Sequence, residues 1–96
     1  MILNTSTTDL DKGVVQQLGN PTVSSIIGNK YIIIPYSNDS GQNITSYSGF
    51  TYKDLGSKSI SGGGHNIYVH FYVVTATETT MKWACTDNRC LFISFD

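Results

Sequence analysis

The most constraining feature of the chain is an unbroken alternation at positions 66–74, Asn-Ile-Tyr-Val-His-Phe-Tyr-Val-Val. Successive side chains of a strand point to opposite faces of the sheet, so one face carries the odd-numbered residues Ile67, Val69, Phe71 and Val73. A strand with one solvated face would carry polar residues at every second position. Here the even-numbered face carries the rings of Tyr68, His70 and Tyr72. We therefore expect both faces to be covered, by a second sheet, a partner subunit or a ligand.

Other β-branched and aromatic runs follow Thr22, and clusters of Gly, Pro, Asn, Asp and Ser separate them. The runs are Val23–Ile27, Lys30–Tyr36, Ile44–Tyr52 with a break near Gly49, Ser57–Ser61, Thr79–Cys85 and Cys90–Phe95. Asp54-Leu55-Gly56 is predicted to be a turn, and Gly62–Gly64 a mobile joint. This pattern predicts an all-β fold, a small antiparallel sandwich or barrel of six to seven short strands.

Two of the intervening turns are typical of hairpins. Gly28-Asn29 suits a two-residue loop, so Val23–Ile27 is expected to pair with Lys30–Tyr36. Thr86–Arg89 would join the last two strands in a second hairpin. In that register Cys85 lies opposite Cys90, and Trp83 lies opposite Phe92.

Residues 1–20 are predicted to form an N-terminal arm that includes a short helix or a strand. Leu10, Val14, Val15 and Leu18 share one helical stripe, and Thr8 is a suitable N-cap. A strand over Gly13–Leu18 is the alternative. The whole chain, 1–96, is expected to be a single domain, because 96 residues cannot enclose a second core.

The composition excludes several classes of function. Charged residues make up 14% of the chain and the net charge is -1, with no basic cluster, so we expect no nucleic-acid binding. No apolar run is long enough to insert in a membrane. The N-terminus lacks the pattern of a signal peptide, so we expect either synthesis in a cytosol or a processed fragment that was given a start Met. Ser, Thr, Gly and Asn supply 38 of the 96 residues, a composition typical of adhesins and virion proteins.

The two cysteines allow three interpretations. Cys85 and Cys90 could be buried thiols, a cross-strand disulfide or part of a metal site. A metal site would need two more ligands, and the spacing of His65 and His70 does not fit a common zinc motif. We therefore expect no metal and no other cofactor.

No standard catalytic motif is present. The enzymatic alternative is a small enzyme or inhibitor that uses His65 or His70 with Glu78 or Asp87. Substitution of both histidines would separate that alternative from a binding protein.

The rings suggest a binding surface. Tyr68, His70 and Tyr72, with Trp83 as a further candidate, could form a stacking platform for sugars, a subunit interface or the second half of a two-layer core. The residues predicted to contact a partner from exposed loops are Asn38, Asp39, Gln42, His65, Asn66, Asp87, Asn88 and Arg89.

In general character the chain resembles virion appendage domains, such as those of bacteriophage tails and fibre tips. The residues behind this resemblance are the Ser/Thr/Asn/Gly-rich loops, the strand Ile67–Val74 and the closing strand Leu91–Phe95. The resemblance implies a homo-oligomer, with a trimer favoured, at a virion or extracellular surface. Its loops would contact a cell-surface glycan or protein receptor. A lectin-like carbohydrate-binding module is the main alternative function.

Overall fold

The computed structural model describes residues 14–18, 21–38 and 40–95, and the regular elements among them are all strands. Side chains are described from residue 21 onward. The strands are β1 (Val14–Leu18), β2 (Thr22–Ser24), β3 (Lys30–Ser37), β4 (Ile44–Ser48), β5 (Phe50–Gly62), β6 (His65–Ala76), β7 (Thr80–Cys85) and β8 (Cys90–Ser94). The all-β prediction is therefore confirmed.

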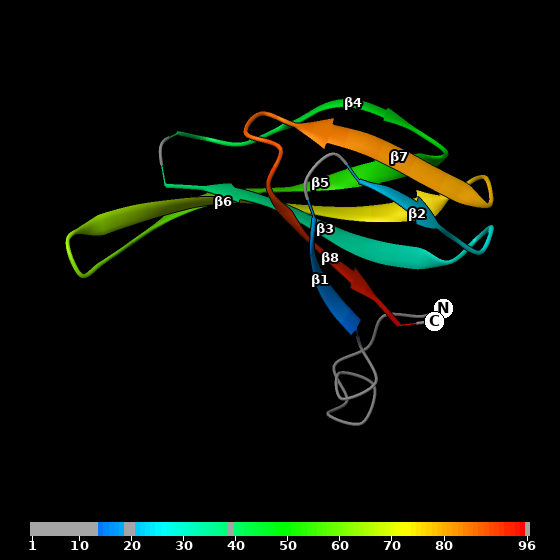
Figure 1. Cartoon of the computed structure of the whole chain (residues 1–96), viewed down its shortest axis with the longest axis horizontal. Coiled ribbons are helices and arrows are strands. Elements are labelled where there is room, and N and C mark those ends of the chain that lie inside the picture. The colour runs from blue at the N-terminus through cyan, green and yellow to red at the C-terminus, as the bar shows by residue number, and fades with distance from the viewer. Residues whose placement is uncertain (1–13, 19–20, 39, 96) are drawn as a thin grey trace.

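The strands form two antiparallel sheets that pack as a small sandwich (Figure 1). The larger sheet has the order β1-β8-β3-β6-β5, and the smaller has the order β2-β7-β4. The described strands number eight, against the six to seven predicted, because Val14–Leu18 forms a strand that pairs with β8. The rest of the segment predicted as an N-terminal arm, residues 1–13 and 19–20, lies outside the described residues.

The core lies between the two sheets. The even-numbered residues of β6 from His70 to Ala76 are buried, whereas Phe71 and Val73 on the other face are only partly buried. The buried apolar side chains are Tyr31, Ile33, Phe50, Tyr72, Val74, Ala76, Met81, Trp83, Cys85, Cys90 and Phe92. The ring-bearing face of β6 is thus covered by the chain's own second sheet, as expected if these rings form the second half of a two-layer core.

Both predicted hairpins are wrong. β2 pairs with β7, while β3 pairs with β6 and β8, so the Gly28 turn connects the two sheets. β7 and β8 likewise belong to different sheets, and Cys85 pairs with Ile44 rather than with Cys90. The turn chemistry is present, since Gly28 has a φ of +88°. However, each strand carries an apolar face that must be buried against the opposite layer, and this requirement decides the pairing.

The hairpin of the structure is the long pair β5–β6. The predicted turn at Asp54–Gly56 is instead a bulge within β5. The glycine run that was predicted to be a mobile joint forms the turn of this hairpin, and Gly63 and Gly64 have φ values of +58° and +80°, as a type I′ turn requires. The outer part of this hairpin, residues 57–68, projects beyond the sandwich (Figure 1). We call these residues the arm.

Gly49 carries the chain from one sheet to the other, between β4 and β5. Its φ is +87°, and a Cβ at this position would lie 2.1 Å from the carbonyl oxygen of Thr80. The Gly49 carbonyl also accepts a hydrogen bond of 2.8 Å from the amide of Thr77. This close crossing brings Tyr47 of β4 against Phe50 and Tyr52 of β5.

Candidate functional site

A polar cluster is centred on His70, at the edge of the core. The Nδ1 atom of His70 lies 2.6 Å from the carbonyl oxygen of Gln42, and Nε2 lies 2.7 Å from Oδ1 of Asp54. Carbonyl and carboxylate oxygens only accept hydrogen bonds. The Gln42 carbonyl and the Asp54 carboxylate therefore hold the ring of His70 from both sides.

The cluster continues through Gln42 to the connection between β7 and β8. The amide of Asp87 donates to Oε1 of Gln42 at 3.0 Å, and Nε2 of Gln42 donates to Oδ2 of Asp87 at 3.3 Å. The same carboxylate oxygen accepts from Ser37, whose hydroxyl in turn accepts from Arg89 at 3.2 Å. Hydrogen bonds thus join the end of β3, the middle of β6 and the β7–β8 connection to the loop before β4.

The hydrogen bond to His70 lowers the pKa of Asp54 below its usual range, helped by the bond that its Oδ1 accepts from the amide of Gly56. Burial raises the pKa of Tyr72, whose hydroxyl accepts a hydrogen bond from the amide of Ile44. Both nitrogens of His70 are engaged, and the residue is 7% exposed. His70 is therefore poorly placed to accept a proton from a substrate, and its carboxylate partner is Asp54 rather than Glu78 or Asp87.

Most of the predicted ring platform lies inside the sandwich. Tyr72 and Trp83 belong to the core, where the Trp83 ring packs 5.4 Å from Phe92. Their rings are therefore used in packing the core. Tyr68 is partly buried at the base of the arm. Of the four residues, His70 and Tyr72 are in direct contact, with stacked rings 4.3 Å apart.

The predicted contact residues divide into two groups. Asn38, His65, Asn66, Asn88 and Arg89 are exposed. Gln42 is buried and Asp87 partly buried, so the prediction of Gln42 as a surface contact is wrong: its side chain is used in the internal cluster. Asp39 lies outside the described residues. His65 and Asn66 flank the tip of the arm.

Two exposed tyrosines, Tyr47 and Tyr52, meet on the surface of the sandwich. Tyr47 is 50% exposed and Tyr52 is 43% exposed, and their ring centroids lie 5.1 Å apart with the planes at 72°. Each also packs on an interior ring, Tyr47 on Phe50 and Tyr52 on Tyr72. The two rings close the side of the sandwich between β4 and β5. Sequence spacing alone could not show this, because the two strands belong to different sheets.

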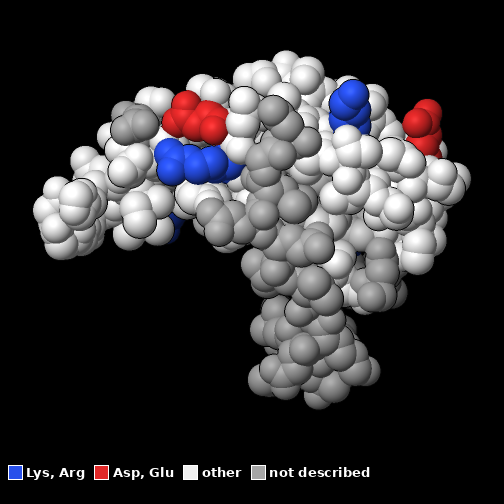
Figure 2. All heavy atoms as spheres, viewed as in Figure 1, with Lys and Arg blue, Asp and Glu red and all other residues white. Residues whose placement is uncertain are grey.

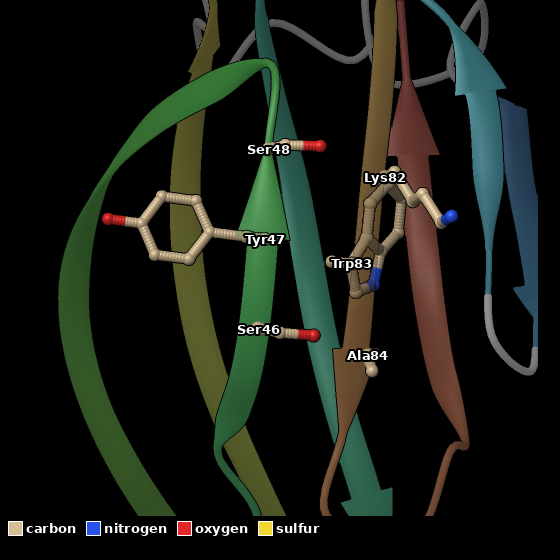
Figure 3. Close-up of a pocket in the computed structure, with 6 residues that line it drawn as sticks. All are labelled: Ser46, Tyr47, Ser48, Lys82, Trp83 and Ala84. Carbon is tan, nitrogen blue, oxygen red and sulfur yellow. The ribbon is translucent and has the colours of Figure 1, made fainter.

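A groove of about 290 Å³ is lined by residues of β4 and β7 (Figure 3). The residues that line it are Ser46, Tyr47, Ser48, Lys82, Trp83 and Ala84. Ser46 and Ser48 point toward β7, whereas the Tyr47 ring points away from it (Figure 3). The lining residues therefore include two hydroxyls, of Ser46 and Ser48, and one amine, of Lys82.

The outer face of the five-stranded sheet is apolar. Its partly buried side chains, which alternate with core residues, are Ile32, Ile34, Tyr36, Val69, Phe71, Val73, Leu91 and Ile93. No described strand packs on this face. By the same alternation its charged residues are cations at the margins: Lys30, Lys53, Lys58 and, over the Tyr36 ring, Arg89.

Charged side chains are few on the face displayed in Figure 2, where one acidic and one basic group lie side by side at the left. On the described surface, another apolar feature is the turn after β2, where Ile26 and Ile27 are 55% and 61% exposed. This turn lies at the end of the sandwich opposite the arm (Figure 1). The hydroxyl of Ser25 donates to the carbonyl of Glu78 at 2.8 Å, which holds an exposed acidic residue beside the turn.

Cys85 and Cys90 are free, buried thiols. The hydrogen bond to Cys90, together with burial, raises the pKa of the Cys85 thiol. The Nε1–H group of Trp83 donates to Sγ of Cys90 at 3.4 Å. Of the three interpretations of this pair, the structure has the buried thiols.

The described residues contain no helix that is long and apolar enough to cross a membrane. They also contain no group of three or more His, Cys, Asp or Glu side chains arranged to hold a metal ion. Comparison with known proteins finds no matching family model, no matching curated protein and no matching solved structure.

Proposed function

We propose that the chain is a non-catalytic assembly and binding module that works as a homo-oligomer, in the manner of virion appendage domains. The observation that carries the proposal is the apolar outer face of the five-stranded sheet. Contiguous apolar surface of this kind marks interaction sites, and aromatic and aliphatic side chains are typical of oligomer interfaces.

The charges on this face favour a head-to-tail contact. In a two-fold contact the same face meets itself, which would bring the marginal cations of two copies together. A heterologous contact avoids this repulsion. The turn at Ile26 and Ile27 provides a complementary surface, because it is apolar and lies beside the acidic Glu78.

Copies that join head to tail form a closed ring if the rotation between them closes. We favour three copies, the number implied by the resemblance to virion appendages. In such a ring the arm and the exposed loop residues Asn38, Asn88 and Arg89 would be available to a receptor on a cell surface.

Two variants test the contact. Phe71→Glu places a charge in the apolar face, and Ile27→Asp places one on the turn; each is expected to give monomers, because a buried unpaired charge costs several kcal/mol. Thr22→Glu, at an exposed position of the smaller sheet, is the matched control and should assemble normally. Sedimentation velocity measures the masses, and Trp83 fluorescence reports whether each variant folds.

Mixing the two monomeric variants distinguishes the contact types. In a head-to-tail assembly each variant keeps the surface that the other has lost, so the mixture should form a 1:1 pair. In a two-fold assembly through the outer face, Ile27→Asp would still form dimers on its own, because its outer face is intact, and Phe71→Glu would stay monomeric in the mixture. Normal assembly of Phe71→Glu alone would contradict the proposed interface.

A further inference from the structure

We propose that Tyr47, Tyr52 and Asp54 form a binding site for a neutral pyranose sugar, on the side of the sandwich between β4 and β5. The site is independent of the assembly proposed above, because its residues do not belong to either contact surface. It also differs from the platform predicted on the ring-bearing face of β6.

The first argument is that the two rings are exposed yet held in place. Tyr47 rests on Phe50 at 5.1 Å and Tyr52 on Tyr72 at 5.3 Å, and each contacts the other edge to face. Interior rings therefore fix the orientation of two half-exposed rings. Tyrosine suits contacts that are partly apolar and partly wet, because its ring stacks and its hydroxyl bonds at the same time. The C–H face of a pyranose is the kind of surface that stacks on such a ring.

The second argument is the position of Asp54. Tyr52 and Asp54 lie on the same face of β5, two residues apart, a separation of about 7 Å along a strand. The Oδ1 atom of Asp54 is bound by His70 and by the amide of Gly56, whereas no described residue donates to Oδ2. The Asp54 side chain is 49% exposed. An oriented carboxylate with one open oxygen can accept hydrogen bonds from sugar hydroxyls, and such charge-assisted bonds are strong.

The third argument concerns the ligand's charge. Asp54 is the acidic residue beside the rings, and its hydrogen-bond partner His70 is buried behind it. The nearby strand positions that share this face of the arm, Ser57 and Ser59, are hydroxyl-bearing. An anionic sugar would be repelled by the Asp54 carboxylate, whereas a neutral sugar would meet only acceptors and hydroxyls. This assigns the ligand class as neutral hexopyranosides.

Saturation-transfer NMR tests the site with three probes, the methyl glycosides of glucose, galactose and mannose, each at about 10 mM, which would saturate a millimolar site. At least one probe should receive saturation from the protein. Tyr52→Ala and Tyr47→Ala should each weaken binding at least tenfold, and Tyr52→Phe, which keeps the ring, should retain it. Methyl glucuronide, which is anionic, should bind more weakly than methyl glucoside.

Lys82→Ala is the matched control, because Lys82 lines the groove on the opposite side of β4. It should leave binding unchanged. Absence of saturation transfer for all three neutral probes would overturn the proposal. So would binding that survives both alanine variants, binding that Lys82→Ala abolishes, or a preference for the glucuronide.

Discussion

Gly49 offers a sharp test of the crossing that brings β4 and β5 together. Substitution by alanine would place a Cβ 2.1 Å from the Thr80 carbonyl oxygen, and at a φ of +87°. The positive φ costs about 1–2 kcal/mol for a residue with a Cβ. The backbone must also move, which weakens the hydrogen bond from the Thr77 amide and costs about 1 kcal/mol more. With the residual clash, Gly49→Ala should lose about 3–4 kcal/mol of a total stability of about 5–14 kcal/mol.

Alanine substitutions at two other glycines separate the cost of the positive φ from the cost of the clash with Thr80. Gly56 has a φ of +96°, but a Cβ at this position would meet no atom within 4 Å, so Gly56→Ala should cost only the conformational term, about 1–2 kcal/mol. Gly41 has neither feature, and Gly41→Ala should be neutral or stabilise by up to about 1 kcal/mol. Guanidinium unfolding followed by the fluorescence of Trp83, the single tryptophan, measures all three. Equal midpoints for Gly49→Ala and Gly56→Ala would refute the close approach at Thr80.

The interior supports three more predictions. The lowered pKa of Asp54 contributes stability that is present above its ordinary pKa of 3.8 and is lost as the pH falls through the lower native value. Acid unfolding of Asp54→Asn should therefore show a shallower loss of stability below about pH 4 than the unmodified protein shows. An unchanged pH profile would argue against the pair with His70. Cys85 and Cys90 should react with a thiol reagent only after unfolding, and the unfolded protein should then show two reactive thiols per chain. Fewer than two reactive thiols per chain in unfolded protein that has not been reduced would indicate a disulfide. Ile33→Ala, in the core, should cost about 3 kcal/mol in thermal or chemical unfolding, whereas Ile26→Ala, on the exposed turn, should cost less than about 0.5 kcal/mol; similar losses would contradict the assigned core.

The sequence was sufficient to predict the class of fold and the central strand. The alternation at 66–74 places the right residues on the buried face of β6, and the covering layer proves to be another part of the same chain. The partner of each strand could not be read in the same way. Gly28-Asn29 and Thr86–Arg89 have hairpin chemistry, but such turns serve equally well to cross between sheets when both flanking strands have an apolar face.

Asp54 illustrates why the candidate site was harder to predict than the fold. The sequence predicts a turn at Asp54–Gly56, and the Asp54 carboxylate does accept a hydrogen bond from the amide of Gly56 two residues on, as in an Asx turn. The chain nevertheless continues as a bulged strand. The contact with His70 depends on the β5–β6 register, and the meeting of Tyr47 with Tyr52 depends on the sheet crossing at Gly49. None of these distances is encoded in sequence spacing.

The central claim is that the apolar outer face of the five-stranded sheet joins copies of the chain. The mass of the unmodified protein in solution, measured by light scattering across a range of concentrations, tests this claim most directly. The account predicts a multiple of the 10.5 kDa chain mass, with three copies favoured. A mass of one chain at every concentration would contradict it.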